Sequence, residues 1–576
     1  MTDHRFPRQI ILGLVAVALL SALLMAWVTG HGVGASRDSC SYFHFARVLL
    51  GQELVQEPDG GPQVALTHFP PLYPAMLALA GVAKMNLLHA ARWINVLSYG
   101  AGVGLFAAIV WRLSGSAART IIGALLLILQ PAYFGCQLWA ASEPPFFLFE
   151  LATIWLLAEF LLCDSPKAWR YAVAAGLTLA IANFTRYVGG FLFPAACVTV
   201  LLAARPWRER RIALAGLIGS FAVPILALAI GQRLLLDSVT HRSIEYHPLT
   251  ATHWWNLLTT IQGWLASRDA FGRPAVWLAW ISVGAILLPL PLREGVGGGV
   301  RGGLSRSSSE DGAEKNLADD SASTLQDRSG PLPLPPPSRG GGNTAARIAV
   351  PAVLVYIALL MFSVAFVDNA TPVDDRLLSP AALLLLLWAV IAIPSPLSFT
   401  AWRRGVVAIA TGLAVLIVAG SGLLRAVHQT RDLRAVGFGF NHINFRNSPL
   451  VKLSKSIPQS TPMYSNYPEA IFLHADHLCA ILPGHPTALG RETDDPMEAA
   501  FGRMENTLRN GGFVAYFGFR SGKSVAAIPA SIDELKARIP LVVEKHTKDG
   551  TLLRALPTSQ PATQATTQGA TTTAVP

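Results

Sequence analysis

The chain has 576 residues, of which 52% are hydrophobic and only 14% are charged. Soluble domains usually carry about 25% charged residues, so this composition excludes an ordinary cytosolic enzyme. The net charge is +10 at pH 7, but the positions of Lys and Arg in short loops explain it better than nucleic-acid binding, and we expect no nucleic-acid partner. The five cysteines form no Cys-x-x-Cys pair, which argues against a metal knuckle or a disulfide framework.

Long apolar runs recur along the chain from its first residues. A helix needs about 20 apolar residues to cross the roughly 30 Å hydrocarbon layer of a membrane. The first run is too long for a signal peptide and has no small-x-small cleavage site, so we interpret it as a signal anchor. In all, the runs predict about eleven spanning helices, near residues 9–29, 93–111, 120–138, 145–163, 170–185, 188–204, 212–231, 274–292, 348–367, 377–394 and 405–424.

The orientation of these helices depends on a shorter apolar run, 72–88. Lys and Arg concentrate in short cytoplasmic loops. If 72–88 does not cross, the short loops 139–144, 186–187 and 368–376 on the outer side carry only 2 Lys and Arg. The segments on the inner side then carry 12 Lys and Arg, and these segments are 1–8, 112–119, 164–170, 205–211 and 395–404. We therefore expect 72–88 to lie along the outer surface, with the N-terminus cytoplasmic.

Composition divides the chain into five parts. Residues 1–292 form an N-terminal transmembrane module with a long first outer loop, 30–92. Residues 293–346 are rich in Gly, Ser and Pro and lack aromatic residues, which predicts a disordered cytoplasmic linker. Residues 347–424 hold the last spans, 425–556 form an extracytoplasmic domain, and 557–576 are a disordered tail.

The outer domain has a polar sequence in which strand-like and helix-like pieces alternate. The strand-like pieces are 462–465, 513–519, 541–544 and 551–556, and the helix-like pieces are 468–476 and 532–539. The predicted fold class is therefore an all-α polytopic membrane domain with juxtamembrane helices, followed by a small C-terminal extracytoplasmic α/β domain.

Two acidic residues stand at the outer ends of predicted spans. Asp38 follows the first span, where a positioned carboxylate can act as a general base; alternatively, it caps a helix over Tyr42–Leu50. Glu143 opens another span before two prolines, a place that also suits a carboxylate at a helix N-terminus. Because both acids face one compartment, they can divide the roles of base and of metal or substrate holder.

Two arginines occupy similar places. Arg186 ends one span and Arg376 opens another, both on the outer side. A guanidinium forms a bidentate fork with phosphate, so both suit a lipid phosphate; the alternative is a snorkelling arginine at a helix end. His68, just before the Phe-Pro-Pro turn of the first outer loop, is a further candidate for the site.

Several short motifs, taken in order, resemble those of the multi-pass GT-C glycosyltransferases. The closest likeness is to the bacterial protein-mannosyltransferase-like and lipid A aminoarabinose-transferase-like group, and it covers most of the chain except 293–346 and the tail. The motifs are Asp38-Ser39-x-x-Tyr42, Leu49-Leu50-Gly51, Phe69-Pro70-Pro71-Leu72-Tyr73-Pro74, Ser142-Glu143, Thr185-Arg186-Tyr187, Asp375-Arg376-Leu377-Leu378-x-Pro380 and Tyr464-Ser465-Asn466-Tyr467-Pro468.

The resemblance implies an enzyme of the bacterial inner membrane that transfers a hexose or pentose from a polyprenyl-phosphate donor. The acceptor would be an extracytoplasmic lipid, glycan or protein, and the anomeric carbon would be inverted. Asp38 matches the base that deprotonates the acceptor hydroxyl, and Glu143 matches a second acid near the acceptor or a divalent metal ion. The resemblance implies substrate-binding roles for Arg186, Arg376, Tyr42, His68 and Tyr73.

A multi-pass transporter or lipid flippase is the alternative function. Transporters place charged residues near the bilayer midplane on broken helices and often have repeated halves. Here the four charged candidates lie at the outer face and the sequence shows no repeat, which favours the enzyme. A catalytically inactive scaffold with an outer binding domain is a third reading.

Overall fold

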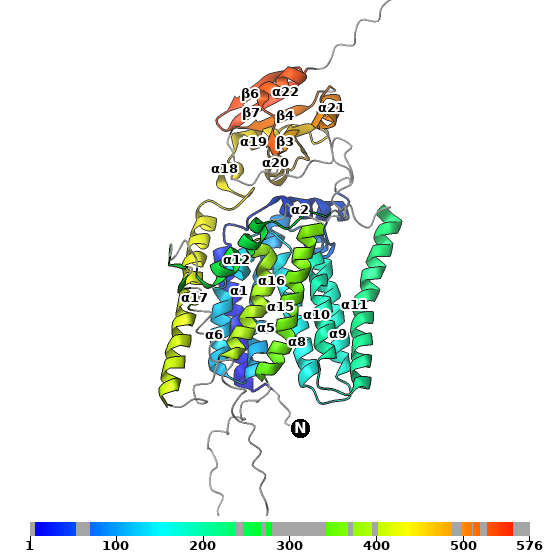
Figure 1. Ribbon diagram of the computed structural model, residues 1–576. Helices are drawn as coiled ribbons and strands as arrows, with labels where there is room; N and C mark the ends of the chain where they lie inside the picture. The colour runs from blue at the N-terminus through cyan, green and yellow to red at the C-terminus, as the bar shows by residue number, and fades with distance from the viewer. Residues whose placement is uncertain are drawn as a thin grey trace, which may run out of the picture.

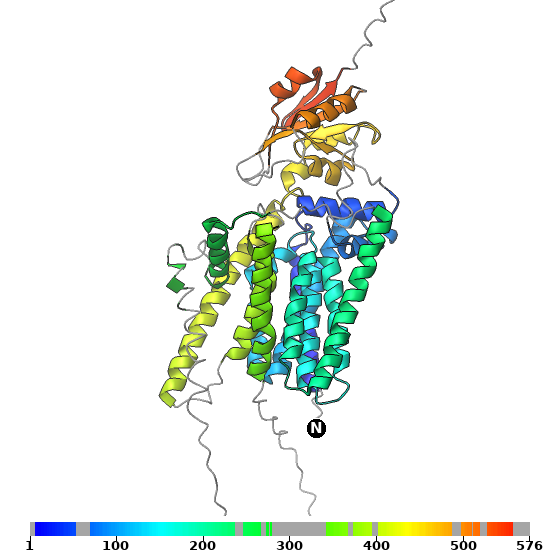
Figure 2. The same ribbon diagram turned by 45° about the vertical axis from the view of Figure 1, so that its right-hand side comes forward.

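The computed structural model is mostly helical, with a small sheet region near the C-terminal end. Long helices form a bundle, the α/β domain stands over one end of it, and the N-terminus lies at the other end (Figure 1, Figure 2). The predicted fold class is confirmed. The structure describes residues 6–52, 69–236, 246–266, 272, 274, 275, 277, 278, 281, 341–366, 373–393, 401–486, 497–509, 511–518 and 527–556.

Within these ranges, seven helices are long and apolar enough to cross a membrane. An eighth candidate is a pair of helices, α6 (Ala117–Ile128) and α7 (Pro131–Gln137), which is bent by 55°. The seven are α1 (Arg8–Val28), α5 (Leu87–Ser114), α8 (Glu143–Leu162), α11 (Trp207–Leu236), α15 (Gly341–Phe366), α16 (Asp375–Ala392) and α17 (Ala401–Ala435).

The remaining predicted spans are shorter or lie outside the described residues. The run 170–185 forms α9 (Trp169–Thr185), and 188–204 forms a 3-10 turn, η1 (Tyr187–Phe191), followed by α10 (Leu192–Leu201). Most of 274–292 lies outside the described residues. The total of about eleven spans therefore stays a prediction.

Small residues let α1 and α5 pack closely. Gly100 and Gly104 lie one turn apart on α5. A Cβ atom at Gly100 would lie 2.7 Å from the carbonyl oxygen of Ala18, and one at Gly104 would lie 2.8 Å from the Ala18 Cβ. Small residues four apart allow membrane helices to approach each other in this way. The close contact places the end of α1, and the loop that follows it, beside α5.

Two short helices cover the end of the bundle that faces the α/β domain. They are α2 (Arg37–Leu49) and α4 (Leu72–Val82), which share an apolar cluster with Phe472. With 11 residues, α4 is about 16 Å long, roughly half the hydrocarbon thickness. The run 72–88 is therefore too short a helix to cross, as its proline-rich start indicated.

The C-terminal domain contains a five-stranded sheet in the order β2-β1-β4-β7-β6. The first three strands are parallel, while β7 pairs antiparallel with both β4 and β6. Strand β3 (Gly484–Pro486) pairs separately with β5 (Ala527–Pro529). The five strands are β1 (Met463–Ser465), β2 (Ala480–Ile481), β4 (Phe513–Phe517), β6 (Leu541–Thr547) and β7 (Gly550–Ala555), and the helices include α19 (Pro449–Ser454), α20 (Pro468–Ala475), α21 (Met497–Leu508) and α22 (Ile532–Arg538).

Two predicted boundaries differ from the structure. Helix α17 continues to Ala435, past the end of the apolar run at 424, so the α/β domain begins beyond residue 425. Helix α15 begins at Gly341, inside the interval 293–346 that composition assigned to the linker. Residues 293–340 and the tail 557–576 lie outside the described residues.

Candidate active site

The loop after α1 turns directly into α2, and Asp38 lies in the first turn of that helix. Ser36 and Ser39 form a reciprocal capping box: the backbone N–H of each residue donates to the hydroxyl of the other, at 2.8 and 3.3 Å. The alternative that Asp38 caps a helix over Tyr42–Leu50 is therefore wrong, because the helix starts earlier and Ser36 caps it. The Asp38 carboxylate instead lies 2.7 Å from the guanidinium of Arg376.

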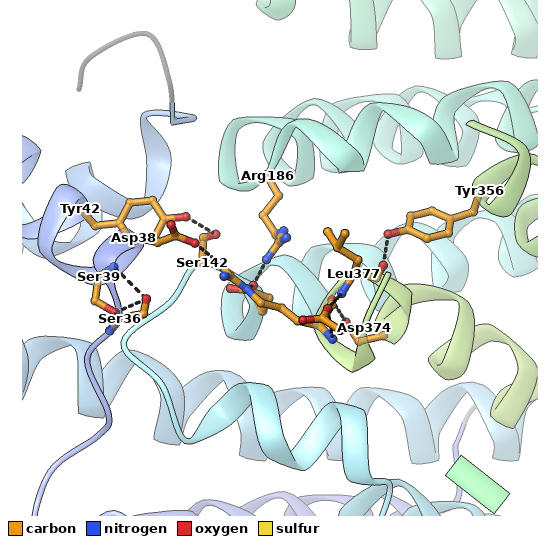
Figure 3. A network of polar contacts seen from close by, with 12 residues as sticks. Ser36, Asp38, Ser39, Tyr42, Ser142, Arg186, Tyr356, Asp374 and Leu377 are labelled. Atoms are coloured by element: carbon orange, nitrogen blue, oxygen red, sulfur yellow. Dashed lines mark hydrogen bonds and ion pairs between the residues drawn. The ribbon is translucent and has the colours of Figure 1, made fainter. Parts of the chain in front are cut away.

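Glu143 receives two guanidinium groups at the N-terminal end of α8. Its Oε1 pairs with both Arg186 and Arg376, and its side chain is only 2% exposed. A buried carboxylate needs such partners, because an unpaired charge away from water is costly. Arg376 therefore bridges Asp38 and Glu143, and the four side chains together carry no net charge. Figure 3 shows this network between α2 and the start of α16.

The first turn of α16 fixes the position of Arg376. Asp374 caps this helix, and its carboxylate accepts from the backbone N–H groups of Arg376 and Leu377, both at 3.1 Å. The Tyr356 hydroxyl of α15 donates to the carbonyl of Leu377 at 2.5 Å. The next acid, Asp375, pairs with Arg425 of α17 at 3.1 Å. The Arg376 side chain thus extends toward α2 and α8 from a turn held by α15 and α17.

Tyr42 and Tyr73 lie beneath Asp38 and are buried. The Tyr42 hydroxyl shares a hydrogen bond of 3.0 Å with the Ser142 hydroxyl, beside Glu143, and its ring lies edge-on to that of Tyr73, 5.0 Å away. Burial raises the pKa of both phenols, so both stay neutral. The Tyr73 hydroxyl is buried without a hydrogen-bond partner among the described residues. His68 lies outside the described residues.

Three loops that are distant in sequence meet beside these residues, and the sequence patterns did not reveal this. Gly34 donates to the Leu138 carbonyl and accepts from the Ala140 N–H, both at 2.8 Å, while Ala35 accepts from the Phe440 N–H at 2.8 Å. Residues 33–35, 138–140 and 438–440 thus run side by side as a short parallel junction. From this junction, the first segment continues to Asp38 in α2 and the second to Glu143 in α8. The third segment enters the α/β domain.

Glycine makes the junction possible. Gly439 has a left-handed backbone with φ of 57°, and a Cβ there would lie 2.1 Å from the Ala35 carbonyl oxygen. A Cβ at Gly34 would lie 2.9 Å from the Trp139 ring. The only signal in the sequence is Gly437-Phe438-Gly439, two glycines around an aromatic residue just after a long helix.

The charge of the site bears on metal binding. The described residues contain no group of three or more His, Cys, Asp or Glu side chains that could hold a metal ion. Two guanidinium groups already neutralise the two carboxylates, so no net negative charge is left there to attract a divalent cation. The site as built does not fit the metal ion that the resemblance allowed.

No protein-family model and no curated sequence matches this chain. Solved structures do match it. That of ArnT from Cupriavidus metallidurans bound to undecaprenyl phosphate has a TM-score of 0.54 at 12% identity, over 95% of this chain and 98% of that one. The Archaeoglobus fulgidus oligosaccharyltransferase tethered with an acceptor peptide has a TM-score of 0.50 at 13% identity, over 88% of this chain and 69% of that one. The chain is therefore a multi-pass membrane protein with the fold of the GT-C glycosyltransferases.

Proposed function

We propose that the protein is a glycosyltransferase that moves a sugar from a polyprenyl-phosphate donor to an acceptor at the outer face of the membrane. The observation that carries the proposal is a cluster of charged side chains at one end of the bundle. In it, the partly exposed carboxylate of Asp38 lies beside two convergent arginines, Arg186 and Arg376. The ArnT structure with undecaprenyl phosphate supports a donor of this class.

Arg376 has a direct part in the proposed reaction. Its side chain is 37% exposed, so a donor phosphate can approach it from the outer side. Guanidinium prefers phosphate in a bidentate geometry, and a phosphate bound there competes with Asp38 for the same N–H groups. Binding of the donor therefore releases the Asp38 carboxylate toward the acceptor hydroxyl.

The transfer step is a displacement at the anomeric carbon of the donor sugar. Asp38 takes the proton of the acceptor hydroxyl while the acceptor oxygen forms a bond to the anomeric carbon. The bond from that carbon to the phosphate oxygen breaks, and its electron pair stays on the phosphate. Arg186 and Arg376 stabilise the charge that develops on this oxygen. Attack opposite the leaving group inverts the anomeric carbon.

The burial of Glu143 favours a different role from the catalytic one that its motif suggested. With only 2% of its side chain exposed, it is poorly placed to touch an acceptor. Its Oε1 holds Arg186 and Arg376 together, and its other oxygen is buried without a hydrogen-bond partner among the described residues. We assign Glu143 as a positioning residue that keeps two like charges side by side.

Membranes that contain the protein provide the test. They are incubated with radiolabelled polyprenyl-phosphate sugars, and the label is followed into lipid, glycan and protein fractions. Transfer by wild type that is lost in Arg376→Gln supports the proposal. Arg112→Gln is the matched control, because Arg112 pairs with Glu159 at 2.7 Å at the other end of α8. Labelled lipid that crosses the membrane without transfer to any acceptor would indicate a flippase instead.

A further inference from the structure

One face of α2 docks on helix α20 of the C-terminal domain. Arg37 pairs with Glu469 at 2.7 Å, and Cys40 lies with its Sγ 3.8 Å from the Glu469 carbonyl oxygen. Further along, the ring of His44 lies 6.3 Å from that of Phe472, and Arg47 stacks on Phe472 at 4.5 Å. The spacing 37, 40, 44 and 47 is that of one stripe along a helix. The docking face therefore covers the whole length of α2.

The adjacent face of α2 carries the site. Asp38 and Tyr42 lie one turn apart and contact Arg376 and Ser142 of the bundle. Consecutive residues on a helix point about 100° apart, so Arg37 and Asp38 turn to different partners from the same backbone. Any rotation of the first turn of α2 moves both side chains together.

The two ends of the docking face differ in what they contribute. At the C-terminal end, Arg47 contacts both Phe472 and Asp476, the latter at 2.5 Å, so packing and charge act together. At the N-terminal end, Arg37 is half exposed, and exposed ion pairs add little to stability. The Arg37–Glu469 pair therefore contributes little to attachment, but it is the contact of the docking face that lies next to Asp38 in the chain.

We propose that Glu469 of the C-terminal domain is a positioning residue for Asp38, acting through Arg37. The inference rests on the proposed function, because Asp38 is the general base only if the protein is a transferase. It gives the outer domain a direct part in the reaction: the domain sets the distance between the base and the acceptor hydroxyl. A misplacement of about 1 Å can cost on the order of 10²-fold in rate.

The test compares three variants in the full-length protein. Arg37→Gln and Glu469→Gln each remove the pair, and the charge swap Arg37→Glu with Glu469→Arg restores it in reverse. We expect each single variant to lower kcat by up to about 10²-fold without raising the donor KM, and the swap to recover most of the loss. Glu498→Gln is the matched control, since it removes an exposed ion pair with Arg538 in the same domain, away from α2.

A native thiol reports on the contact without any activity. Burial and the Glu469 carboxylate raise the pKa of Cys40, so it should react slowly with a thiol reagent in the intact protein. Arg37→Gln leaves that carboxylate in place, so faster labelling of Cys40 in this variant reports that α2 has moved away from α20. Cys479, within the domain, is the internal reference for mass-spectrometric detection.

The outcomes separate the two proposals. A wild-type protein that transfers no sugar overturns the proposed function, while Cys40 labelling still shows whether the pair holds α2. An active wild type with normal kcat in both single variants overturns the positioning role. So does a swap that fails to recover kcat although its thermal stability equals that of wild type.

Discussion

Arg376 is the residue on which the candidate site depends most. It contacts Asp38 with one nitrogen and Glu143 with another, so a single side chain sets the separation of the two acids. A planar guanidinium can do this because its five N–H donors have a fixed geometry. A lysine at this position would have one ammonium group for both carboxylates and no such fork.

The general-base role predicts a large effect of Asp38→Asn. The amide keeps the size of the side chain and accepts a hydrogen bond from Arg376, but it cannot take a proton from the acceptor. We expect transfer to fall by about 10²-fold or more, while binding of a polyprenyl phosphate, measured by titration in detergent, is not weakened, because the neutral amide competes less for Arg376. Near-normal turnover in this variant would remove Asp38 from the mechanism.

Glu143→Gln should act mainly on stability. It leaves two buried arginines without their shared carboxylate, and breaking a buried ion pair by removing one partner costs about 3–5 kcal/mol. Thermal unfolding followed by tryptophan fluorescence should therefore show a much lower Tm for Glu143→Gln than for Asp38→Asn. If Glu143→Gln abolishes transfer with an unchanged Tm, Glu143 acts in the chemistry and not as a positioning residue.

Sequence motifs located the charged residues but not their pairing. Asp38, Glu143, Arg186 and Arg376 each stand at the predicted outer end of an apolar run, so topology alone gathers them at one face. Which guanidinium meets which carboxylate depends on the tilt and separation of α2, α8, α9 and α16, and no local pattern records these. The interpretation of Asp38 as a cap failed because Ser36 and Ser39 satisfy the N–H groups first.

At the scale of secondary-structure elements, the parallel junction of residues 33–35, 138–140 and 438–440 explains how distant segments stay in register. Each contributes only a few residues, and each lies just outside a helix. Hydrogen bonds between their backbones fix the height of these segments relative to one another, and the helices that follow them carry Asp38 and Glu143. Neither apolar periodicity nor composition could predict a contact made by three such short segments.

Gly439→Ala tests the junction. The left-handed backbone alone costs a residue with a Cβ about 1–2 kcal/mol, and the added Cβ would collide with the Ala35 carbonyl. We expect a lower Tm and reduced transfer. The matched change is Gly412→Ala in α17, where nothing lies within 4 Å of the added Cβ; it should be neutral or stabilise the helix by about 0.5–1 kcal/mol. Equal effects of the two changes would contradict a special role for Gly439.

At the scale of the whole molecule, the first loop and the C-terminal domain lie on the same end of the bundle. Helix α2 contacts α20 directly, and the N-terminus lies at the opposite end (Figure 1). The Lys and Arg counts predicted this common side, because the first of about eleven spans precedes the first loop and an even number then separates the two regions. The assignment of that end to the outer side rests on the same counts.

Impermeant thiol labelling of intact cells tests that assignment. We expect new labelling in both Gly60→Cys and Ala499→Cys relative to wild type, because both positions belong to the predicted outer side. Labelling of both only after the membrane is permeabilised would reverse the orientation. Labelling of one position alone would contradict the shared side itself.

The junction also has a consequence for the timing of synthesis. The segments at 33–35 and 138–140 leave the ribosome early, but their third partner, at 438–440, comes about 300 residues later, which at about 5–20 residues per second takes roughly 15–60 s. Until then, Ala35 lacks the hydrogen bonds that it exchanges with Phe438 and Phe440. A nascent chain therefore spends this interval in the membrane with an unfinished candidate site, and a truncated product never completes it.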